Sequence, residues 1–456
     1  MRRVLARSAD LTQGVIWKEM LIFFVPIMLG TFFQQLYNTV DAVVVGQFVG
    51  KEALAAVGGS ASILINLLVG FFVGLSSGAT VIISQYHGAR DHDAVGRSVH
   101  TAMALALACG LVLMVVGIVF APQMLRVMHT PEETIADSAT YMRIYFVGVI
   151  PALIYNIGSG VLRAVGDSRR PLYFLIVCCV ANIVLDLLFV VGFHMGVAGA
   201  AWATILSMAA SAALVVGSLM RTPHSYQLHI RKIRFDRAIL GRVMRIGMPA
   251  GLQSVLYSVS NLLIQSSINA FGTDAVAAWA TFGKIDGLLW MILSAFGIAA
   301  TTFVGANYGA KRMDRVKKSV VAALVMAFAS AFAMSVVVHF GGRVFYRLFT
   351  ADEAVVELGL RMMSAITPFY FTYVAIEILS GALRGMGDAL KPMLLTCFGI
   401  CVLRVVWILV IVPFAPVVEM VALSYPVTWV ITSALFAWYY LKGSWRKRIQ
   451  AQMLGA

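Results

Sequence analysis

Charged residues are scarce in this sequence. They make up 12% of the 456 residues, whereas 60% are apolar and the mean hydropathy is +0.87. A soluble protein of this length could not bury so much apolar surface, since typical globular domains carry about 25% charged residues. The composition therefore excludes a soluble domain and predicts many membrane-spanning helices, each of about 20 apolar residues.

Sequence motifs for enzymes and for nucleotide hydrolysis are also missing. No G-x-x-x-x-G-K-[ST] segment occurs, the expected loops are too short for a catalytic domain, and no histidine lies in the middle of an expected span. Cys397 and Cys401 share a helix face, but no His or carboxylate accompanies them, so packing is the favoured role. We expect no enzyme, no disulfide and no cofactor, which leaves an ion gradient as the energy source.

Hydropathy, interrupted by charged residues and by Gly and Pro, predicts twelve spans. They cover approximately residues 20–45, 58–84, 99–120, 141–162, 172–192, 199–220, 248–270, 278–303, 319–340, 361–382, 393–412 and 421–440. The segment from Met1 to Lys18 is basic and has no short apolar core before a cleavage site. We therefore expect a cytosolic tail there and no cleaved signal peptide.

Basic residues are distributed unevenly over the expected loops. Of the 35 Lys and Arg residues, 27 fall at the chain ends and in alternate loops, six fall on the opposite side, and Lys284 and Arg404 lie within spans. This bias predicts a multi-pass protein of the cell (inner) membrane with both termini in the cytoplasm. The net charge of +14 then requires no nucleic-acid partner. The lipid bilayer is the expected surrounding, and we expect a monomer.

The sequence contains an internal duplication. Residues 160–171 (GVLRAVGDSRRP) recur as residues 381–392 (GALRGMGDALKP), with six of twelve positions identical at an offset of 221, and Pro26 and Pro249 keep nearly the same offset. Each repeat holds six expected spans, an even number, so both copies insert the same way up. We expect parallel repeats around an axis along the membrane normal, with a central cavity between them.

These repeats predict an all-α protein with an N-lobe at residues 1–230 and a C-lobe at residues 231–456. The cytoplasmic linker, about residues 221–245, alternates basic and apolar side chains. This pattern fits an amphipathic helix lying on the inner leaflet, and it fits a plain basic loop equally well.

Carboxylates inside the spans of the first half mark a candidate ion site, because a charge near the bilayer centre is costly unless it is paired or hydrated. Asp41 lies in the first span, and Asp186 lies in the fifth, one turn after Asn182. Asn156 and Thr204 add oxygens if their spans converge, although such residues more often bond one helix to another. This set of oxygens could hold Na⁺ or share protons.

The second half lacks these ion-site residues. The repeat partners of Asp41, Asn182 and Asp186 are the apolar residues Ile264, Leu403 and Trp407. Its own intramembrane charges are Lys284, Asp286, Glu377 and Arg404. Lys284 with Asp286, and Glu377 with Arg404, fit structural ion pairs, and it is equally open that Glu377 or Asp286 attracts cationic substrates.

With these features the chain resembles the multidrug and toxic compound extrusion (MATE) family. The likeness covers nearly the whole chain and includes Pro26 to Asp41, both L-R-x-x-G-D-x-x-x-P loops, and Lys284-Ile-Asp286. The resemblance implies twelve spans in two lobes. It also implies exchange of H⁺ or Na⁺ for organic cations and other amphipathic drugs.

The resemblance further implies site residues. In the family's DinF-like branch, a cation site in the N-lobe uses residues that match Asp41, Asn156, Asn182, Asp186 and Thr204, and a proline matching Pro26 permits the first span to bend. Candidate ligands of a bound Na⁺ are Asp41, Asp186 and Asn182. The NorM-like branch places a Glu and an Asp where this chain has Tyr257 and Tyr373, so a C-lobe cation site of that type is in doubt.

The sequence thus predicts a secondary active exporter that couples H⁺ or Na⁺ influx to drug efflux by alternating access. Candidate substrate contacts are Glu377, Asp286, Gln34, Gln253 and Tyr257. The alternative is a flippase for a lipid-linked precursor, which would need a basic cavity, whereas the spans hold two cations against four acids. The sequence leaves the coupling ion and the substrates open.

Overall fold

The structure, a computed structural model, describes residues 11–443 and Trp445. The basic residues before Leu11 and after Trp445, on which part of the topology prediction depends, lie outside this range. Every regular element in the described range is helical. The chain divides into two compact units, with Ile22–Gly251 in unit 1 and with Thr12–Leu21 and the residues from Leu252 onward in unit 2. By these contacts, residues 231–251 belong with unit 1, whereas we expected the lobes to divide at 230/231.

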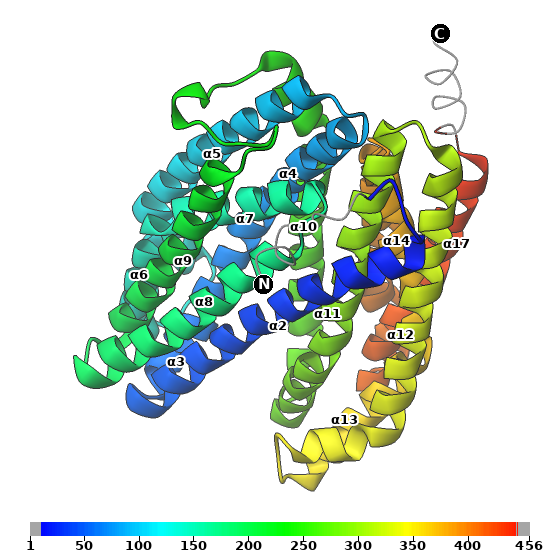
Figure 1. The fold of residues 1–456 in the computed structure, drawn as a ribbon. Coiled ribbons are helices and arrows are strands. Elements are labelled where there is room, and N and C mark those ends of the chain that lie inside the picture. The colour runs from blue at the N-terminus through cyan, green and yellow to red at the C-terminus, as the bar shows by residue number, and fades with distance from the viewer. Residues whose placement is uncertain (1–10, 444, 446–456) are drawn as a thin grey trace. The chain divides into compact units, whose positions relative to one another are not determined.

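Unit 1 is a helical bundle in which α7 packs on both α4 and α9, α8 packs on α9, and α6 packs on α5 (Figure 1). The helices run in chain order as α2 (Ile16–Phe48), α3 (Lys51–Gly58), α4 (Ser60–Gly88), α5 (His92–Val127), α6 (Glu132–Val147), α7 (Val149–Ala164), α8 (Arg169–Asp186), the short η1 (Leu187–Gly192) and α9 (Gly196–Arg221). The bundle gives α2, α8 and α9 the apolar surroundings in which the acidic residues are buried.

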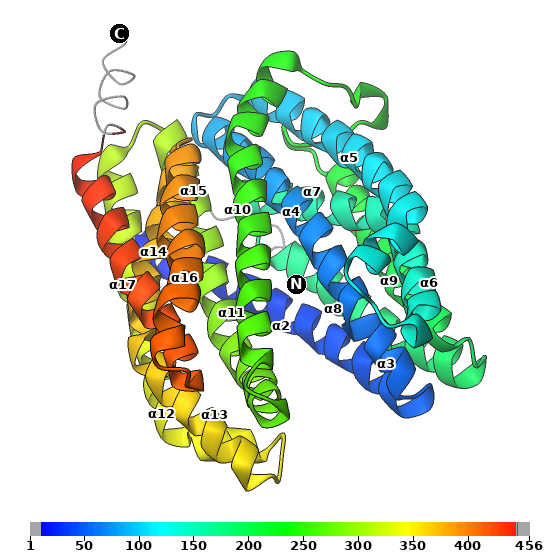
Figure 2. The same cartoon turned by 180° about the vertical axis from the view of Figure 1, so that it is seen from behind.

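Unit 2 is a second bundle in which α11 packs on α12 and α14, and α14 packs on α17 (Figure 2). Its elements are α10 (Arg237–Asn269), α11 (Thr273–Gly309), α12 (Met313–Arg347), α13 (Glu353–Ile366), η3 (Thr367–Phe369), α14 (Tyr370–Gly385), α15 (Leu390–Thr396), η4 (Cys397–Val402), α16 (Leu403–Val406), η5 (Trp407–Ile411), η6 (Val412–Phe414) and α17 (Val418–Lys442). The first part of α10, up to Gly251, belongs to unit 1.

Ten helical stretches of the described chain are long and apolar enough to cross a membrane, and the bent pair α6–α7 makes an eleventh. The remaining long helix, α10, falls below that hydropathy because it carries residues such as Gln253, Asn261 and Gln265. These ten stretches, the bent pair and α10 occupy the positions of the twelve expected spans. The multi-span, all-helical class is confirmed.

The fourth expected span is not one straight helix. Between α6 and α7 the axis bends by 48° at Gly148. A side-chain carbon at Gly148 would collide with Ile205 of α9, so only glycine allows α9 to approach there. The tenth span is also interrupted, at Thr367–Phe369, the repeat counterpart of this break. Hydropathy reports how apolar a segment is and not the direction of its helix axis. The sequence prediction therefore missed both interruptions.

The repeated G-D loops have the same backbone in both units. Gly166 has φ +92° and Gly387 has φ +90°, a region that favours glycine. Asp167 N donates to Leu162 O, and Asp388 N donates to Leu383 O, so each loop ends its helix with the same capping pattern. The duplicated motif is therefore explained by a helix end that needs glycine at one position.

The linker between α9 and α10 is a loop with a single short turn, η2 (Ile230–Lys232), so the amphipathic-helix alternative is wrong for residues 222–236. Side chains of α5 take the backbone donors that a helix would use. His229 N donates to His100 Nε2 (3.1 Å), and Asp236 N donates to Thr101 Oγ1 (3.1 Å). The linker is thus tied to unit 1.

The first part of α10 packs on α4 through glycines on both helices. A side-chain carbon added at Gly74 of α4 would lie 2.6 Å from Gly251 Cα, and one added at Gly78 would lie 2.7 Å from Gly247 N. Pairs of small residues four positions apart let membrane helices approach to backbone contact. This glycine contact explains why α10 up to Gly251 belongs to unit 1.

Candidate functional site

Four of the five predicted ion ligands come together in unit 1. Asp41 lies on α2, Asn182 and Asp186 lie on the last turns of α8, and Thr204 lies on α9, and none of these residues is more than 5% exposed. Thr204 Oγ1 donates to Asp41 Oδ2 (3.1 Å), and the Asp41 carboxyl group interacts with Asp186 and Asn182. We call these four residues the acidic cluster.

Most polar atoms of the acidic cluster have no hydrogen-bond partner among the described residues. They are Asp41 Oδ1, both oxygens of Asp186, and the oxygen and nitrogen of Asn182. A buried polar atom without a partner costs about 1–3 kcal/mol. Five such atoms lie on three neighbouring side chains. The interaction of Asp41 with Asp186 and Asn182 offsets part of this cost, and a bound cation or a shared proton would offset more. Oxygen atoms from carboxylates and amides suit a hard cation, and two neighbouring carboxyl groups suit a shared proton.

The backbone changes directly after the acidic cluster. The α-helix α8 ends at Asp186, and the π-helical turn η1 follows it. Asn182 and Asp186 are four positions apart and therefore lie on one face of α8. A π-helical turn widens a helix and is frequent at functional sites. The irregular turn thus marks the same place as the buried carboxylate.

Asn156, the fifth predicted ligand, is half-buried on α7, and its Nδ2 donates to Ala152 O of its own helix (2.9 Å). Its role in ion binding stays a prediction. Gln34 is exposed on α2. Pro26 is buried inside α2, which continues as one helix on both sides of it.

Three tyrosines adjoin the acidic cluster and were missed by sequence reasoning. Tyr37, on α2, and Tyr141 and Tyr145, on α6, all interact electrostatically with Asp41. Tyr37 could have been found, because it precedes Asp41 by four residues and so shares its helix face. No sequence signal places the two tyrosines of α6 against α2.

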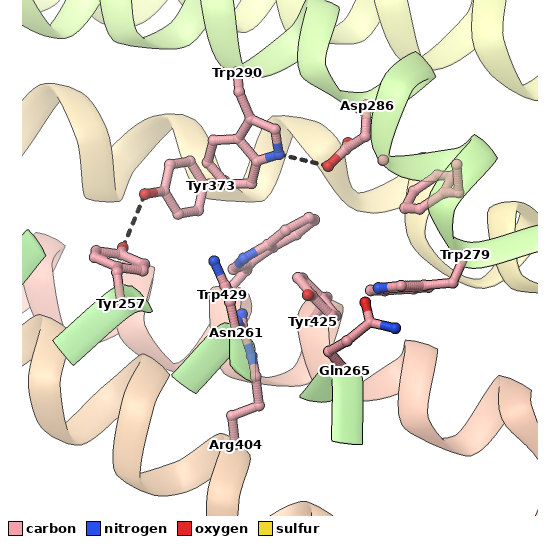
Figure 3. Close-up of a pocket in the computed structure, with 12 residues that line it drawn as sticks. Tyr257, Asn261, Gln265, Trp279, Asp286, Trp290, Tyr373, Arg404, Tyr425 and Trp429 are labelled. Atoms are coloured by element: carbon pink, nitrogen blue, oxygen red, sulfur yellow. Dashed lines mark hydrogen bonds between the residues drawn. The ribbon is translucent and has the colours of Figure 1, made fainter. Parts of the chain in front are cut away.

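Unit 2 contains a separate cavity of about 530 Å³ (Figure 3). Its walls are largely aromatic, and they include Tyr257, Trp279, Trp290, Tyr373, Tyr425 and Trp429. Asp286 of α11 and Arg404 of α16 also line it. We call this cavity the aromatic pocket. It has the size and the mainly apolar lining of a small-molecule site.

The polar groups of the aromatic pocket contact its aromatic side chains. Tyr257 and Tyr373 share a hydrogen bond between their hydroxyl groups (2.9 Å), and Trp290 Nε1 donates to Asp286 Oδ2. The Arg404 guanidinium carbon lies 4.0 Å from the centre of the Tyr425 ring, a cation–π contact. The Tyr257 and Tyr373 hydroxyl groups thus bond to each other, and Tyr373 also interacts with Glu377.

Neither expected ion pair of the second half is present among the salt bridges of the described residues. Lys284 Nζ lies over the Phe349 ring, 5.3 Å from its centre. Residues two positions apart in a helix point in different directions, so Lys284 and Asp286 do not face each other. Glu377 interacts with Arg384 of the repeat motif instead of Arg404.

The predicted substrate contacts of the second half separate into two groups. Asp286 and Tyr257 line the aromatic pocket. Gln253 Nε2 donates to Thr396 Oγ1 (3.3 Å), and the Glu377 carboxyl group lies against Gly297 of α11. Two of these four residues therefore face the cavity, and two make contacts between helices.

The fold and the buried polar sites define a polytopic helical membrane protein with two repeated halves. The MatE family model matches the chain twice, at residues 26–188 and 249–410, so the duplication is found independently. The chain belongs to the MATE family of transporters, as the resemblance predicted.

Among its relatives, probable multidrug resistance protein YoeA of Bacillus subtilis is 28% identical over 441 residues, which cover 95% of each chain. Probable multidrug resistance protein YpnP of the same organism is 29% identical over 401 residues, which cover 87% of this chain and 89% of that protein. A solved structure described as a multidrug resistance MATE family transporter of the MOP superfamily has a TM-score of 0.89, with 98% of each chain covered and 24% identity. That last similarity supports the fold.

Proposed function

We propose that this protein is a secondary active multidrug exporter that couples the influx of H⁺ or Na⁺ to the efflux of organic cations and other amphipathic molecules. Family membership supports transport, and the names of the relatives support drugs as substrates. The acidic cluster is the single observation that supports ion coupling, because its open carboxyl oxygens are buried in an apolar bundle.

Coupling in this proposal follows from differential binding. An ion can drive a conformational change only if it binds one state more tightly than the other. Asp41 and Asp186 lie on different helices, α2 and α8, so a change in the position of α2 alters the distance between their oxygens. Bending of α2 at Pro26, where the ring removes a backbone hydrogen bond, is the proposed movement.

The proposal also includes the finer assignments from the sequence. In this proposal the protein acts as a monomer in the cell membrane, has both termini in the cytoplasm, and belongs to the DinF-like branch, whose ion-site residues match residues of this chain. Asn156 completes the ion site when the ion is bound. These assignments rest on the charge bias of the loops and on the residues that match that branch.

The test uses purified protein in proteoliposomes, with a pH gradient or a Na⁺ gradient imposed separately. Transport of a fluorescent organic cation is expected with one of the two gradients, which identifies the coupling ion. Asp41→Asn should abolish this transport, because it removes one of the two carboxylates. Asp137→Asn is the matched control, since Asp137 is exposed on α6 of the same unit.

Normal gradient-driven transport by Asp41→Asn would disprove the proposed ion site. Transport that requires neither gradient would disprove secondary active export. Loss of cell-wall precursor supply in a deletion strain with unchanged drug sensitivity would favour the flippase.

A further inference from the structure

The linker of residues 222–236 folds back along α5 (Figure 1). His229 N donates to His100 Nε2, and Asp236 N donates to Thr101 Oγ1. Both acceptors lie more than two turns after the start of α5, where the expected span 99–120 begins. The linker is therefore held at the level where the hydrocarbon of the membrane begins.

The helix face that the linker covers continues into lipid. Leu107 and Leu111 lie seven and eleven residues after His100, so all three residues share one face of α5. His100 is 7% exposed beside the linker, whereas Leu107 and Leu111 are 38% and 53% exposed within the span. The linker thus lies on the lipid-facing side of α5, at the membrane surface.

Two large apolar side chains of the linker are exposed. Ile230 is 60% exposed and Phe235 is 49% exposed, whereas Tyr226 and Leu228 of the same linker are buried. At a bilayer surface, apolar side chains enter the boundary between headgroups and acyl chains. Ile230 and Phe235 therefore suit contact with lipid.

Exposed cations lie on both sides of these apolar residues. The four cations are Arg231, Lys232, Arg234 and Arg237. Asp236, the one acid in residues 222–237 of the sequence, is paired with Arg97 of α5 (3.1 Å). The bias of basic loops to one side of a membrane accounts for the sign of this charge. It does not account for the exposed Ile230 and Phe235, or for the hydrogen bonds that hold the segment at the level of the lipid.

We propose that the linker binds anionic phospholipids in the leaflet beside it, which is the inner leaflet in the proposed topology. The four cations contact the headgroups, and Ile230 and Phe235 enter the adjoining acyl region. Clusters of four or more basic residues next to a membrane-spanning helix suit anionic lipids by charge complementarity. This binding is separate from the proposed export function and does not depend on it.

The test measures amide hydrogen exchange of the purified full-length protein in lipid nanodiscs, by mass spectrometry of peptides that cover the linker. Nanodiscs of phosphatidylcholine are compared with nanodiscs in which phosphatidylglycerol replaces part of that lipid. Linker amides should exchange at least about fivefold more slowly with phosphatidylglycerol, the factor that one basic residue contributes near an anionic surface. Adding about 1 M NaCl should remove this slowing, because it screens charges beyond about 3 Å.

Matched variants separate the linker charges from the net charge. Arg231→Gln/Lys232→Gln/Arg234→Gln should lose the slowing. Lys311→Gln/Lys317→Gln/Lys318→Gln is the control, because it removes the same charge from exposed positions of unit 2, and it should keep the slowing. Ile230→Ser/Phe235→Ser should reduce the slowing at least about twofold, since less apolar surface enters the lipid.

Equal linker exchange in the two kinds of nanodisc would overturn the inference. So would slowing that the linker triple variant retains, or that about 1 M NaCl leaves unchanged. Full slowing in Ile230→Ser/Phe235→Ser would overturn the apolar contact. Slowing by added polyglutamate, with none by phosphatidylglycerol, would overturn lipid binding in favour of a soluble acidic partner.

Discussion

The two units treat their buried polar groups differently. In unit 1, three neighbouring side chains, Asp41, Asn182 and Asp186, leave five polar atoms without partners. In unit 2, Asp286 and Arg404 each leave one such atom, and aromatic side chains hold the rest of each group. The same repeat therefore supports an open acidic site in one half and an aromatic cavity in the other.

This difference is chemical and does not extend to the scaffold. Both units end a helix at the G-D loop with positive φ, and both interrupt one span at corresponding positions. Backbone geometry depends on a few glycines, whereas side chains that face a cavity can change without moving the backbone. Duplicated halves can thus keep one architecture and acquire different ligands.

The largest expected effect is that of removing the open carboxylate of unit 1. Asp186→Leu keeps the branched shape and makes the position apolar, as it already is at Trp407 in unit 2. Transport should fall at least tenfold, while the protein becomes more stable by about 1 kcal/mol, since burying an apolar side chain costs less than burying a second carboxyl group beside Asp41. Transport assays and thermal unfolding in detergent measure the two effects. Increased stability with normal transport would show that unit 1 does not use this carboxylate.

A scaffold glycine should have similar effects in both units. Gly78→Ala puts a carbon 2.7 Å from Gly247 N, and Gly385→Ala puts one 2.7 Å from Thr301 O. Neither backbone atom can move freely, so each substitution should destabilise by about 1–3 kcal/mol, measured by thermal unfolding. Gly217→Ala is the control, because no atom lies within 4 Å of the added carbon. A loss confined to one unit would mean that the scaffolds are not equivalent.

A smaller loss is expected from the hydroxyl pair of unit 2. Tyr257→Phe removes the hydrogen bond to Tyr373 and should destabilise by about 0.5–1.5 kcal/mol, since the Tyr373 hydroxyl keeps only its interaction with Glu377. Thermal unfolding measures this loss, and the Tyr257→Phe/Tyr373→Phe double variant should regain part of it. If the single and double variants equal the unchanged protein, the polar groups of unit 2 do not depend on each other.

The smallest effect concerns the linker outside the membrane. Backbone donation from Ile239 and the neighbouring Arg97 lower the pKa of Asp236 below its usual 3.8. A lowered pKa in the folded state means that the carboxylate stabilises the protein above pH 3.8 and loses that effect as the pH falls through the lowered value. Asp236→Asn should therefore lower the melting temperature at pH 7, and the difference should shrink at pH 3. A difference that is the same at both pH values would contradict this assignment.

Much of the fold could be predicted from sequence, because hydropathy reports the transfer of whole segments into lipid. The twelve spans follow from it, and α10 was found although its polar residues lower its average. The bend at Gly148 and the short turn at Thr367–Phe369 that interrupts the tenth span were missed, since hydropathy does not report helix geometry. The linker was left undecided between helix and loop because its outcome depends on hydrogen bonds from α5.

The site was predictable only in part for a related reason. Asp41 and Asp186 stood out because a buried carboxylate is costly wherever its helix packs. The sequence left structural ion pairs open as one alternative, and neither pair is among the salt bridges of the described residues, since pairing depends on direction and a helix turns Lys284 away from Asp286. Nothing in the sequence distinguishes Tyr141, Tyr145 and the aromatic residues around Arg404 from other aromatic residues in the expected spans. Only the assembled bundles show which of them meet.

The π-helical turn after Asp186 has a counterpart at Trp407–Ile411, directly at the residue that aligns with Asp186. The widened backbone is thus present in both copies, although only one copy carries the carboxylate. A π-helical turn alters backbone hydrogen bonds over several residues, whereas a carboxylate at this position requires the single substitution Trp407→Asp. Trp407→Asp would therefore put a carboxylate next to a π-helical turn in the second half, the arrangement that unit 1 has at Asp186.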